Sequence, residues 1–530
     1  MSMPSASASF LPLGAFRPAG DLQIRLQRNF DRLEEEKYRP ENVFQREKEA
    51  GNWPGDTEGR TVLALVLLAQ ATGREPRYLD EILSRWSREV NTRGYFGHIL
   101  SVDTISEQQL AGHGWVLRAL AELERWRPGG PARSLAAPIL ENLILPTAGQ
   151  HRLYPLDPAV RRTEGQFSGT HLGRVGRWLL STDVGCDFIC LDGVVDAFDV
   201  FRDERLRPVI EEMSARFLEL DLAAVKAQTH ATLTACRALL RWSAISGDDS
   251  LVPAVAERYA LYTQQAWTEH YANFNWFGRP EWTEPCAIVD SLMVAMELWR
   301  RTQAPGYLED VQHIYFNALA HAQRSNGGFG CDNCPGADGE ADLFFKVYEA
   351  HWCCTMRGGE GLSRVAQYCL EATGDEWRLP LGLAGDVDLG GAKLTIASSY
   401  PTEFSLTIRA SGFAGKDVRT LALFVPSWVK GIRCENTAGV PCERVDGWLR
   451  LPVGRDDESW TISGDLVSSL RPVLNPLAAR KPRVVRQRGA LLLAESPGES
   501  SAEPIFHAMK SGIVDPTLSR RRLLIETPDA

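Results

Sequence analysis

Two short motifs carry the side chains with the strongest potential for chemistry, Glu284-Pro285-Cys286 and His351-Trp352-Cys353-Cys354. Together they offer one carboxylate and three thiols. Adjacent cysteines do not readily bridge to each other, because a disulfide needs its own Cα separation and torsion. Three thiolates and a carboxylate are, however, ordinary ligands of a tetrahedral zinc ion. The residue types therefore predict a Zn²⁺ site formed by Glu284, Cys286, Cys353 and Cys354.

The residues alone leave the purpose of such a site open. A free cysteine has a pKa of about 8.5, whereas coordination to Zn²⁺ removes the thiol proton. The site could simply join two parts of the fold, or one thiolate could be a nucleophile, or no metal could bind. A further pair, Cys331 and Cys334 in Cys331-Asp332-Asn333-Cys334, could combine with Cys353 and Cys354 in an all-cysteine site instead.

The segment that contains these motifs reads as a succession of helices from about Leu22 to Gly374. Thr61–Gln70 is apolar on nearly every face, which is typical of a helix buried on both sides. Helix stops are expected at Gly73, Gly247, Gln303–Gly306 and Gly374. About six helical hairpins fit this length, and six hairpins that bury their apolar faces against one another form an (α/α)6 barrel. An open solenoid is the alternative, but the sequence shows no strict internal repeat.

After Gly374 the pattern changes to short alternating runs separated by Gly, Pro, Asp and Asn, which predicts an antiparallel β-sandwich. We therefore expect an N-terminal tail over residues 1–20, a helical barrel over 21–375 and a sandwich over 380–530, with the boundary at 374–385. Ser496–Glu503 is expected to be a polar loop. The predicted strands are Val387–Tyr400, Glu403–Ala410, Val418–Val425, Gly447–Val453, Ser459–Gly464, Arg483–Ala494 and Arg521–Glu526.

Composition excludes several classes of partner. The formal net charge of −10 argues against a nucleic acid, and the basic stretches Lys481–Arg488 and Ser519–Arg522 are short enough to be solvated surface. No stretch reaches 18 uninterrupted apolar residues, so a membrane span is not expected. Met1–Gly20 lacks the pattern of a signal peptide. Eleven cysteines without a small-domain disulfide pattern predict reduced thiols in the cytoplasm.

The Glu-x-Cys and Cys-Cys motifs resemble those of the bacterial β-L-arabinofuranosidase family, glycoside hydrolase family 127. The likeness extends over most of residues 20–495. It includes four other segments, which are similar to the H-E-L-Y-x-A-G-H, G-H-A-x-R-A, L-R-I-P-S-W and R-G-P-L motifs of that family. In this chain they are Ser106–His113, Thr229–Ala238, Leu423–Trp428 and Arg488–Leu491.

The resemblance implies a role for each residue of the site. Glu284, Cys286, Cys353 and Cys354 would hold zinc, and Cys353 would attack the anomeric carbon in a retaining mechanism. The acid/base in the family is a glutamate a short way before the metal glutamate, which makes Glu269 the candidate and Glu281 a less favoured one. A retaining glycosidase needs such a carboxyl about 5 Å from its nucleophile. The residues expected to bind sugar hydroxyls are His113, His230 and His270.

This chain departs from the family pattern beside the sugar. Ser106 replaces a histidine, and Gly185-Cys186-Asp187-Phe188 stands where the family has G-H-P-E. Thr355–Glu360 also differs from the residues that follow the family's double cysteine. We therefore predict a retaining glycoside hydrolase that acts on a furanoside or a modified pentose or deoxy sugar.

Two other functions stay open, namely lyase or epimerase chemistry on the same barrel, and a carbohydrate-binding pseudoenzyme with structural zinc. The expected partner is a small-molecule carbohydrate. A homodimer is one of the oligomeric states left open.

Overall fold

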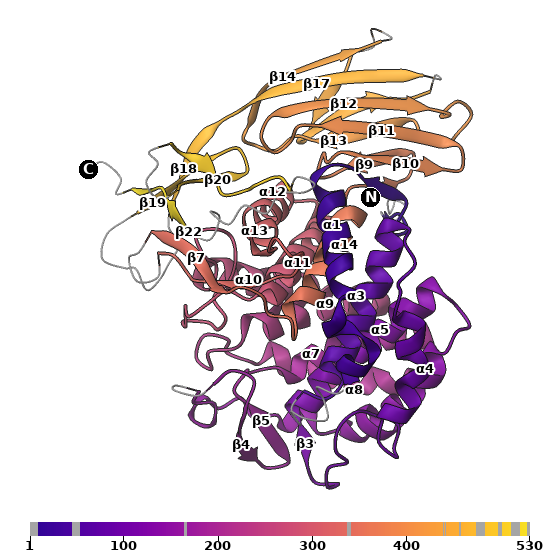
Figure 1. Cartoon of the computed structure of the whole chain (residues 1–530), viewed down its shortest axis with the longest axis vertical. Coiled ribbons are helices and arrows are strands. Elements are labelled where there is room, and N and C mark those ends of the chain that lie inside the picture. The colour runs from indigo at the N-terminus through magenta and orange to yellow at the C-terminus, as the bar shows by residue number, and fades with distance from the viewer. Residues whose placement is uncertain are drawn as a thin grey trace.

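The computed structural model describes residues 9–44, 53–163, 167–336, 341–437, 439, 441–454, 457–472, 483–496, 501–509 and 520–526. Helices make up the larger body of the molecule, and most strands of the C-terminal part lie together at one end of it (Figure 1). Among the described helices, none combines the length and the apolar character needed to cross a membrane. Parts of the predicted loop Ser496–Glu503 and of both basic stretches lie outside the described residues.

Six of the described helices form a closed ring, in which each contacts the next and the last contacts the first. Most of their residues are buried, so these helices are surrounded by protein along most of their length. In order around the ring they are α3 (Asp56–Thr72), α5 (Glu107–Trp126), α7 (Asp187–Phe201), α9 (Thr229–Ser246), α11 (Pro285–Thr302) and α14 (Cys354–Gln367).

A second group of helices packs against the ring, each on one or two of its members. In these helices burial follows one face only. In α4, for example, Leu79, Ile82 and Trp86 are buried at helical spacing. The group comprises α1 (Asp21–Leu33), α4 (Leu79–Glu89), α6 (Ala132–Ile139), α8 (Arg207–Leu218), α10 (Leu251–Gln265) and α12 (Pro305–His313), and the short α13 (Ala320–Ala322) follows α12.

Helix α3 confirms the prediction of a helix buried on both sides, because every residue from Asp56 to Ala69 is buried. It ends at Gly73, whose φ of 70° is the left-handed conformation that glycine adopts without strain. The helix stop predicted at Gly374 is wrong. Helix α14 has already ended at Gln367, and Gly374 forms the turn between two strands, β8 (Glu371–Thr373) and β9 (Glu376–Leu379).

Helices α5 and α7 approach each other closely at two glycines. A Cβ atom on Gly193 would lie 2.1 Å from the Gly114 carbonyl oxygen, and one on Gly114 would lie 2.7 Å from Cys190 Cα. Only residues without a side chain allow this approach. It brings the first turn of α7, and the loop before it, close to α5.

Two six-stranded sheets contain most of the predicted strands. The first has the order β1 (Ser9–Phe10), β8, β9, β13 (Thr420–Phe424), β16 (Trp448–Pro452), β15 (Glu443–Val445). The second has the order β14 (Val429–Asn436), β17 (Glu458–Leu466), β12 (Phe404–Ser411), β11 (Ala392–Ser398), β10 (Gly385–Leu389), β2 (Phe16–Pro18). Neighbouring strands are antiparallel apart from the parallel pair β9 and β13.

Two further sheets include strands from the helical part of the chain. The larger joins β6 (Cys331–Asp332) and β7 (Asp342–Val347) to C-terminal strands, and the smaller contains β3 (Ile105–Ser106), β5 (Trp178–Ser181) and β4 (His171–Val175). The C-terminal strands are β18 (Ser468–Pro472), β19 (Val484–Arg488), β20 (Leu491–Glu495), β21 (Glu503–Pro504), β22 (Arg520–Leu523) and β23 (Ile525–Glu526).

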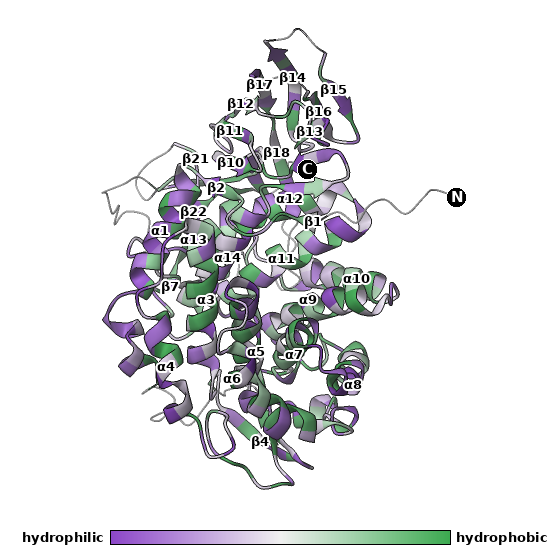
Figure 2. Cartoon of the chain, turned by 90° about the vertical axis from the view of Figure 1, so that its right-hand side faces the viewer, coloured by the Kyte–Doolittle hydropathy of each residue, from purple (hydrophilic) through white to green (hydrophobic). Residues whose placement is uncertain are grey.

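The hydropathy colouring of Figure 2 shows apolar residues along the helices of the body. One continuous apolar cluster runs through the ring helices and both six-stranded sheets. Residues that we expected to form an N-terminal tail take part in this arrangement, since Phe16 is buried and β2 pairs with β10. The division at residues 374–385 stays a prediction.

The expectation that all cysteines are reduced is wrong for one pair. Cys434 and Cys442 form a disulfide, because β14 and the segment before β15 bring them to a Cα separation of 6.4 Å. Disulfides are more typical of oxidising compartments than of the cytoplasm. The cytoplasmic location stays a prediction without support from the structure.

Candidate functional site: a thiol cluster at two helix N-termini

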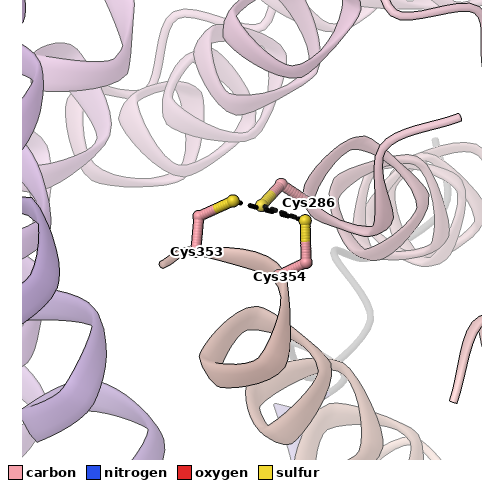
Figure 3. Close-up of side chains that lie close together, drawn as sticks. All are labelled: Cys286, Cys353 and Cys354. Atoms are coloured by element: carbon pink, nitrogen blue, oxygen red, sulfur yellow. Dashed lines mark hydrogen bonds between the residues drawn. The ribbon is translucent and has the colours of Figure 1, made fainter. Parts of the chain in front are cut away.

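The predicted thiols lie at the first turns of two ring helices. Glu284 is the N-cap residue of α11, with extended backbone, and Pro285 and Cys286 begin the helix. Cys353 is the N-cap residue of α14, and Cys354 is the first residue of that helix. Figure 3 shows the three sulfur atoms pointing toward one another from the two helix ends. A helix N-terminus carries partial positive charge, which favours thiolates there.

The spacing of the sulfur atoms fits a common metal ion. Cys353 Sγ lies 3.3 Å from Cys354 Sγ, and Cys286 Sγ lies 3.8 Å from Cys354 Sγ. A tetrahedral ion with Zn–S bonds of about 2.3 Å holds its sulfur ligands roughly 3.8 Å apart. These buried and half-buried groups could therefore hold a metal ion.

Glu284 supplies the fourth candidate ligand. Its carboxylate lies within 4.8 Å of Cys286 Sγ and of a ring nitrogen of His230. Asn275 orients it, since the Asn275 amide donates to Glu284 Oε2 at 2.6 Å and accepts from Trp282 Nε1 at 3.2 Å. Burial, with a further contribution from Asp183, raises the pKa of Glu284 to about 8. Protein surrounds this carboxyl group, yet one side of it opens on a cavity.

The thiols need a cation to become thiolates. Burial raises the pKa of Cys286 and of Cys354 well above the usual range, and for Cys353 the largest cause of a raised pKa is its hydrogen bond with Cys286. Arg60 is a fixed positive charge beside them. It donates to Cys286 Sγ at 3.4 Å and to Asp56 Oδ1 at 2.8 Å. The donor set, three soft sulfurs and one carboxylate, fits a thiophilic divalent cation such as Zn²⁺.

His230 is the one predicted sugar-binding histidine that the structure places at this site. Its Nδ1 pairs with Asp290 Oδ2 at 2.8 Å, and its Nε2 lies 3.4 Å from Arg60 Nη2. Burial lowers the pKa of His230 to about 4, so the ring is neutral at neutral pH. The ring stacks on Trp115.

Asp290 is the centre of a buried ionic network behind His230. Its Oδ1 accepts from Arg237 of α9 and from Arg357 of α14, while Thr234 donates to its Oδ2 at 2.9 Å. These contacts hold the pKa of Asp290 well below its usual range despite full burial. The network fixes the relative positions of three ring helices around the thiols.

A cavity of about 650 Å³ opens beside the thiols. Cys353, Cys354 and Glu284 contribute to its wall, whereas Cys286 does not. The other lining residues are Trp53, Asp56, Thr57, Arg60, Ser168, Gly169, Asp183, Ile189, Gln228, His230, Asn275, Trp282, Cys331, Lys346, Val347, Ala350 and Trp352. Three tryptophans and several amide and carboxyl groups give this wall the mixed character of a small-molecule site.

Glu269 does not line this cavity. Its carboxyl group is buried against the backbone of Gly336, its carbonyl accepts from Arg471, and burial raises its pKa to about 7. The less favoured Glu281 is exposed and pairs with Arg279.

His113 and His270 also lie away from the cavity wall. Both ring nitrogens of His113 are occupied, one by the backbone N–H of Phe96 at 2.9 Å and the other by the carbonyl of Gln109 at 2.7 Å. His270 approaches Asp332, whose charge is matched by buried Arg324. The structure places both histidines in polar contacts of the core.

The alternative all-cysteine site is only partly assembled in the described part of the chain, where Cys331 contacts Cys354. Cys331 lines the cavity, but neither Cys331 nor Cys334 belongs to a described group of metal-ligand atoms. Cys334 instead lies 3.9 Å from the carbonyl oxygen of Asn273.

Sequence reasoning missed Asp183, Trp53 and Trp282, which share the cavity wall with the thiols. None of the three lies in a motif that spacing alone could identify. Trp282 precedes Glu284 closely, and this proximity to a predicted ligand was the only available signal.

Comparison with known proteins bears on the fold. No protein-family model matches the sequence, and no curated protein is similar enough to count as a relative. Among solved structures, a GH127 β-arabinofuranosidase is similar with a TM-score of 0.68 and 12% identity over 93% of this chain and 86% of the other. The fold is GH127-like.

Two further solved structures are similar to this chain over most of its length. A GH127 β-L-arabinofuranosidase from Geobacillus stearothermophilus T6 has a TM-score of 0.66 and 12% identity, and covers 92% of this chain and 87% of its own. A protein described as a glycoside hydrolase has a TM-score of 0.66 and 13% identity, over 93% and 84%. The likeness confirms the predicted resemblance at the level of the fold.

Proposed function

We propose that this protein is a retaining glycoside hydrolase that uses Cys353, as a zinc-bound thiolate, to attack a furanoside or a modified pentose or deoxy sugar. One observation carries the proposal. Three thiols converge at two helix N-termini, with the carboxylate of Glu284 close to Cys286, and the group opens on a cavity in a chain with a GH127-like fold. We also interpret the helix ring and its outer helices as an (α/α)6 barrel, and the two six-stranded sheets as a β-sandwich that begins near residues 374–385.

Exposure singles out Cys353 among the thiols. Cys286 is fully buried, and Cys354 is 1% exposed, whereas Cys353 is half-buried and lines the cavity. The expected ligands are Glu284, Cys286, Cys353 and Cys354. A bound zinc ion would keep their sulfur atoms deprotonated at neutral pH.

The chemistry then needs two displacements. Cys353 Sγ forms a bond to the anomeric carbon as the glycosidic C–O bond breaks, and a carboxylic acid gives its proton to the leaving oxygen. Water then attacks the same carbon, gives its proton to that carboxylate and releases the sulfur, so that the sugar leaves with its original configuration. The resemblance assigns the proton transfer to Glu269, whose raised pKa suits it but whose carboxyl does not line the cavity.

The cavity is suited to a carbohydrate with a further group attached. Its volume of about 650 Å³ lies within the usual range for small-molecule sites. Trp53, Trp282 and Trp352 offer apolar faces on which a sugar ring can stack, and His230, Gln228 and Asn275 offer hydrogen bonds to hydroxyl groups.

A panel of 4-nitrophenyl glycosides, led by the β-L-arabinofuranoside, tests the function. We expect release of nitrophenol from at least one furanoside or pentoside, and NMR of the first product should show retained anomeric configuration. An inverted product contradicts the mechanism. An unsaturated sugar, or an isomerised sugar without a new reducing end, would instead establish lyase or epimerase chemistry.

The metal is tested separately. Elemental analysis of protein purified without chelators should find about one equivalent of zinc, because buried thiols converge stably when a cation neutralises their thiolates. Cys286→Ser should lower the zinc content, while Cys236→Ser, at a buried thiol of α9 outside the cluster, should not. A zinc content near zero in the wild type contradicts the metal site. Cys353→Ser protein that retains full turnover would leave zinc a structural role.

A further inference from the structure

Asp183 lines the same cavity as the thiol cluster, although it lies far from the cysteine motifs in the sequence. It lies in the loop between β5 and α7, is 5% exposed, and lines the same cavity as Cys353 and Glu284. It is also close enough to Glu284 to raise the pKa of that residue, second only to burial. The Asp183 carboxyl therefore shares the cavity wall with the candidate ligand Glu284 and with the proposed nucleophile.

Hydrogen bonds hold this carboxyl group in place. Ser168 Oγ donates to Asp183 Oδ1 at 2.8 Å, and the Asp183 backbone N–H donates to Ser181 Oγ at 3.1 Å. Gln108 of α5 joins the segment before β4 to the end of β5, because its amide donates to the Gly169 carbonyl at 3.0 Å and to Ser181 Oγ at 3.1 Å. The donors that position the Asp183 carboxyl group, Ser168 and the backbone of Gly169, are neutral.

Among the described residues, Asp56, Asp183 and Glu284 are the carboxyl groups that line the cavity, and they differ in their partners. Asp56 forms an ion pair with Arg60, and Glu284 lies at the thiols as a candidate ligand. In the described part of the chain, no arginine, lysine or histidine forms an ion pair with Asp183. Burial without an ion-pair partner disfavours the charged form of a carboxyl group, so Asp183 holds its proton at a higher pH than an exposed aspartate does.

The state of Asp183 also suits a proton donor. Burial raises its pKa to about 6, against hydrogen bonds from Ser168 and Gly169 that lower it, and the charges of Glu107 and Arg279 act in opposite directions. General acids and bases work best when their pKa lies near the working pH.

We propose that Asp183 is the catalytic acid/base of the hydrolase, in place of Glu269. The inference rests on the proposed glycosidase function. Asp183 gives its proton to the leaving oxygen as Cys353 Sγ bonds to the anomeric carbon, and later accepts a proton from the water that displaces the sulfur. The Glu269 carboxyl instead lies against Gly336, its backbone carbonyl accepts from Arg471, and it does not line the cavity.

The test compares Asp183→Asn with wild type on two probes, phenyl and 2,4-dinitrophenyl β-L-arabinofuranoside. Phenoxide is a poor leaving group, so cleavage of the first probe needs a proton on the leaving oxygen. Dinitrophenolate is a good leaving group, so the second probe is cleaved without that proton. We expect kcat/KM on the phenyl probe to fall by about 10²–10⁴-fold and on the dinitrophenyl probe by less than about tenfold. Azide, which attacks without a base, should restore turnover of the dinitrophenyl probe and yield the glycosyl azide.

Three further variants make the test decisive. Asp183→Glu, which keeps the carboxyl group, should recover part of the lost activity on the phenyl probe. Asp310→Asn changes another carboxyl of raised pKa, on α12 and outside the cavity, and should leave the ratio of the two rates unchanged. Glu269→Gln should likewise not alter that ratio. Thermal melts and zinc content establish that each variant is folded.

The outcomes distinguish the acid/base role of Asp183 from the glycosidase function on which it rests. An active wild type whose Asp183→Asn variant loses both probes equally, without azide rescue, overturns the acid/base role of Asp183 and leaves the glycosidase function standing. The same holds if Glu269→Gln, rather than Asp183→Asn, shows the dependence on the leaving group. A wild type that cleaves neither these probes nor any member of the glycoside panel overturns both levels.

Discussion

At the scale of single residues, chemistry follows from what surrounds each group. Cys353 and Cys354 are neighbours in the chain, yet one is half-buried at the cavity and the other is 1% exposed. Asp183 and Asp56 share a cavity wall, yet among the described residues Asp56 has an arginine partner and Asp183 has none. Residue type identifies candidates, and exposure and counter-charges decide between their roles.

The raised pKa of Asp183 predicts a pH dependence. The first step needs Asp183 protonated, so the fraction of competent enzyme falls as the pH rises through about 6. Wild-type kcat/KM on phenyl β-L-arabinofuranoside should therefore decline above that pH by about tenfold per pH unit. Stopped assays between pH 5 and 9 measure it. In Asp183→Asn this alkaline decline should be absent, and its persistence would assign the titrating group elsewhere.

The sequence was informative about residues that act together in short motifs. Glu284 with Cys286 and Cys353 with Cys354 could be recognised because each pair lies within one helix start. Asp183 could not be recognised, since its role depends on a loop that tertiary packing carries to the thiols. His113 and His270 were expected to bind sugar hydroxyls, but neither lines the cavity. The rotation of a helix or loop decides which way a histidine faces, and here both rings face core partners instead.

At the scale of elements, the site depends on how ring helices are held together. Helices α9, α11 and α14 meet at the buried Asp290 network, directly behind His230. The helix starts of α11 and α14 carry the thiols, so a change in the angle between these helices would separate the sulfur atoms.

Asp290→Ala should be strongly destabilising. It would leave Arg237 and Arg357 without this buried counter-charge, and breaking a buried pair in this way costs about 3–5 kcal/mol. Asp199→Ala removes a partner of Arg125 near the surface and should cost less than about 1 kcal/mol. Urea unfolding measures both. Equal, small effects of the two substitutions would contradict a structural role for the network.

Helix boundaries were predictable where glycine ends a helix, as at Gly73 and Gly247. The misassigned stop at Gly374 shows the limit of that signal, since a glycine of positive φ also serves a β-turn. Strands were predictable where apolar residues alternate with polar ones, whereas β14, in which Val429 is the one buried residue, offers no apolar face of that kind.

At the scale of the whole molecule, the helical body and the sheets share strands as well as a core. Strand β2 near the N-terminus is an edge of the second sheet, and β7, which precedes α14, pairs with β22 near the C-terminus. The place of β1 and β2 in the sheets could not be predicted from sequence, because strands of two and three residues leave no readable alternation.

The shared strands predict that the C-terminal part does not fold alone. A fragment from Gly385 to Ala530 lacks β2, β8, β9 and β7, and exposes the apolar face that packs on the helices. We expect it to be insoluble or without a cooperative thermal transition by circular dichroism, while the full chain unfolds in one transition. A soluble fragment with its own sharp transition would show instead that the two parts are independent.

The proposed mechanism depends on Cys353 Sγ as the nucleophile, and covalent labelling tests this role most directly. The protein is incubated with a bromoacetamide derivative of β-L-arabinofuranose, with and without competing 4-nitrophenyl β-L-arabinofuranoside, and the modified peptide is identified by mass spectrometry. We predict a single adduct on Cys353, protection by the competitor, and loss of turnover in proportion to labelling, because Cys353 is the half-buried thiol at the cavity. An adduct on Cys354 or Cys286, or full turnover of protein labelled at Cys353, would contradict the account.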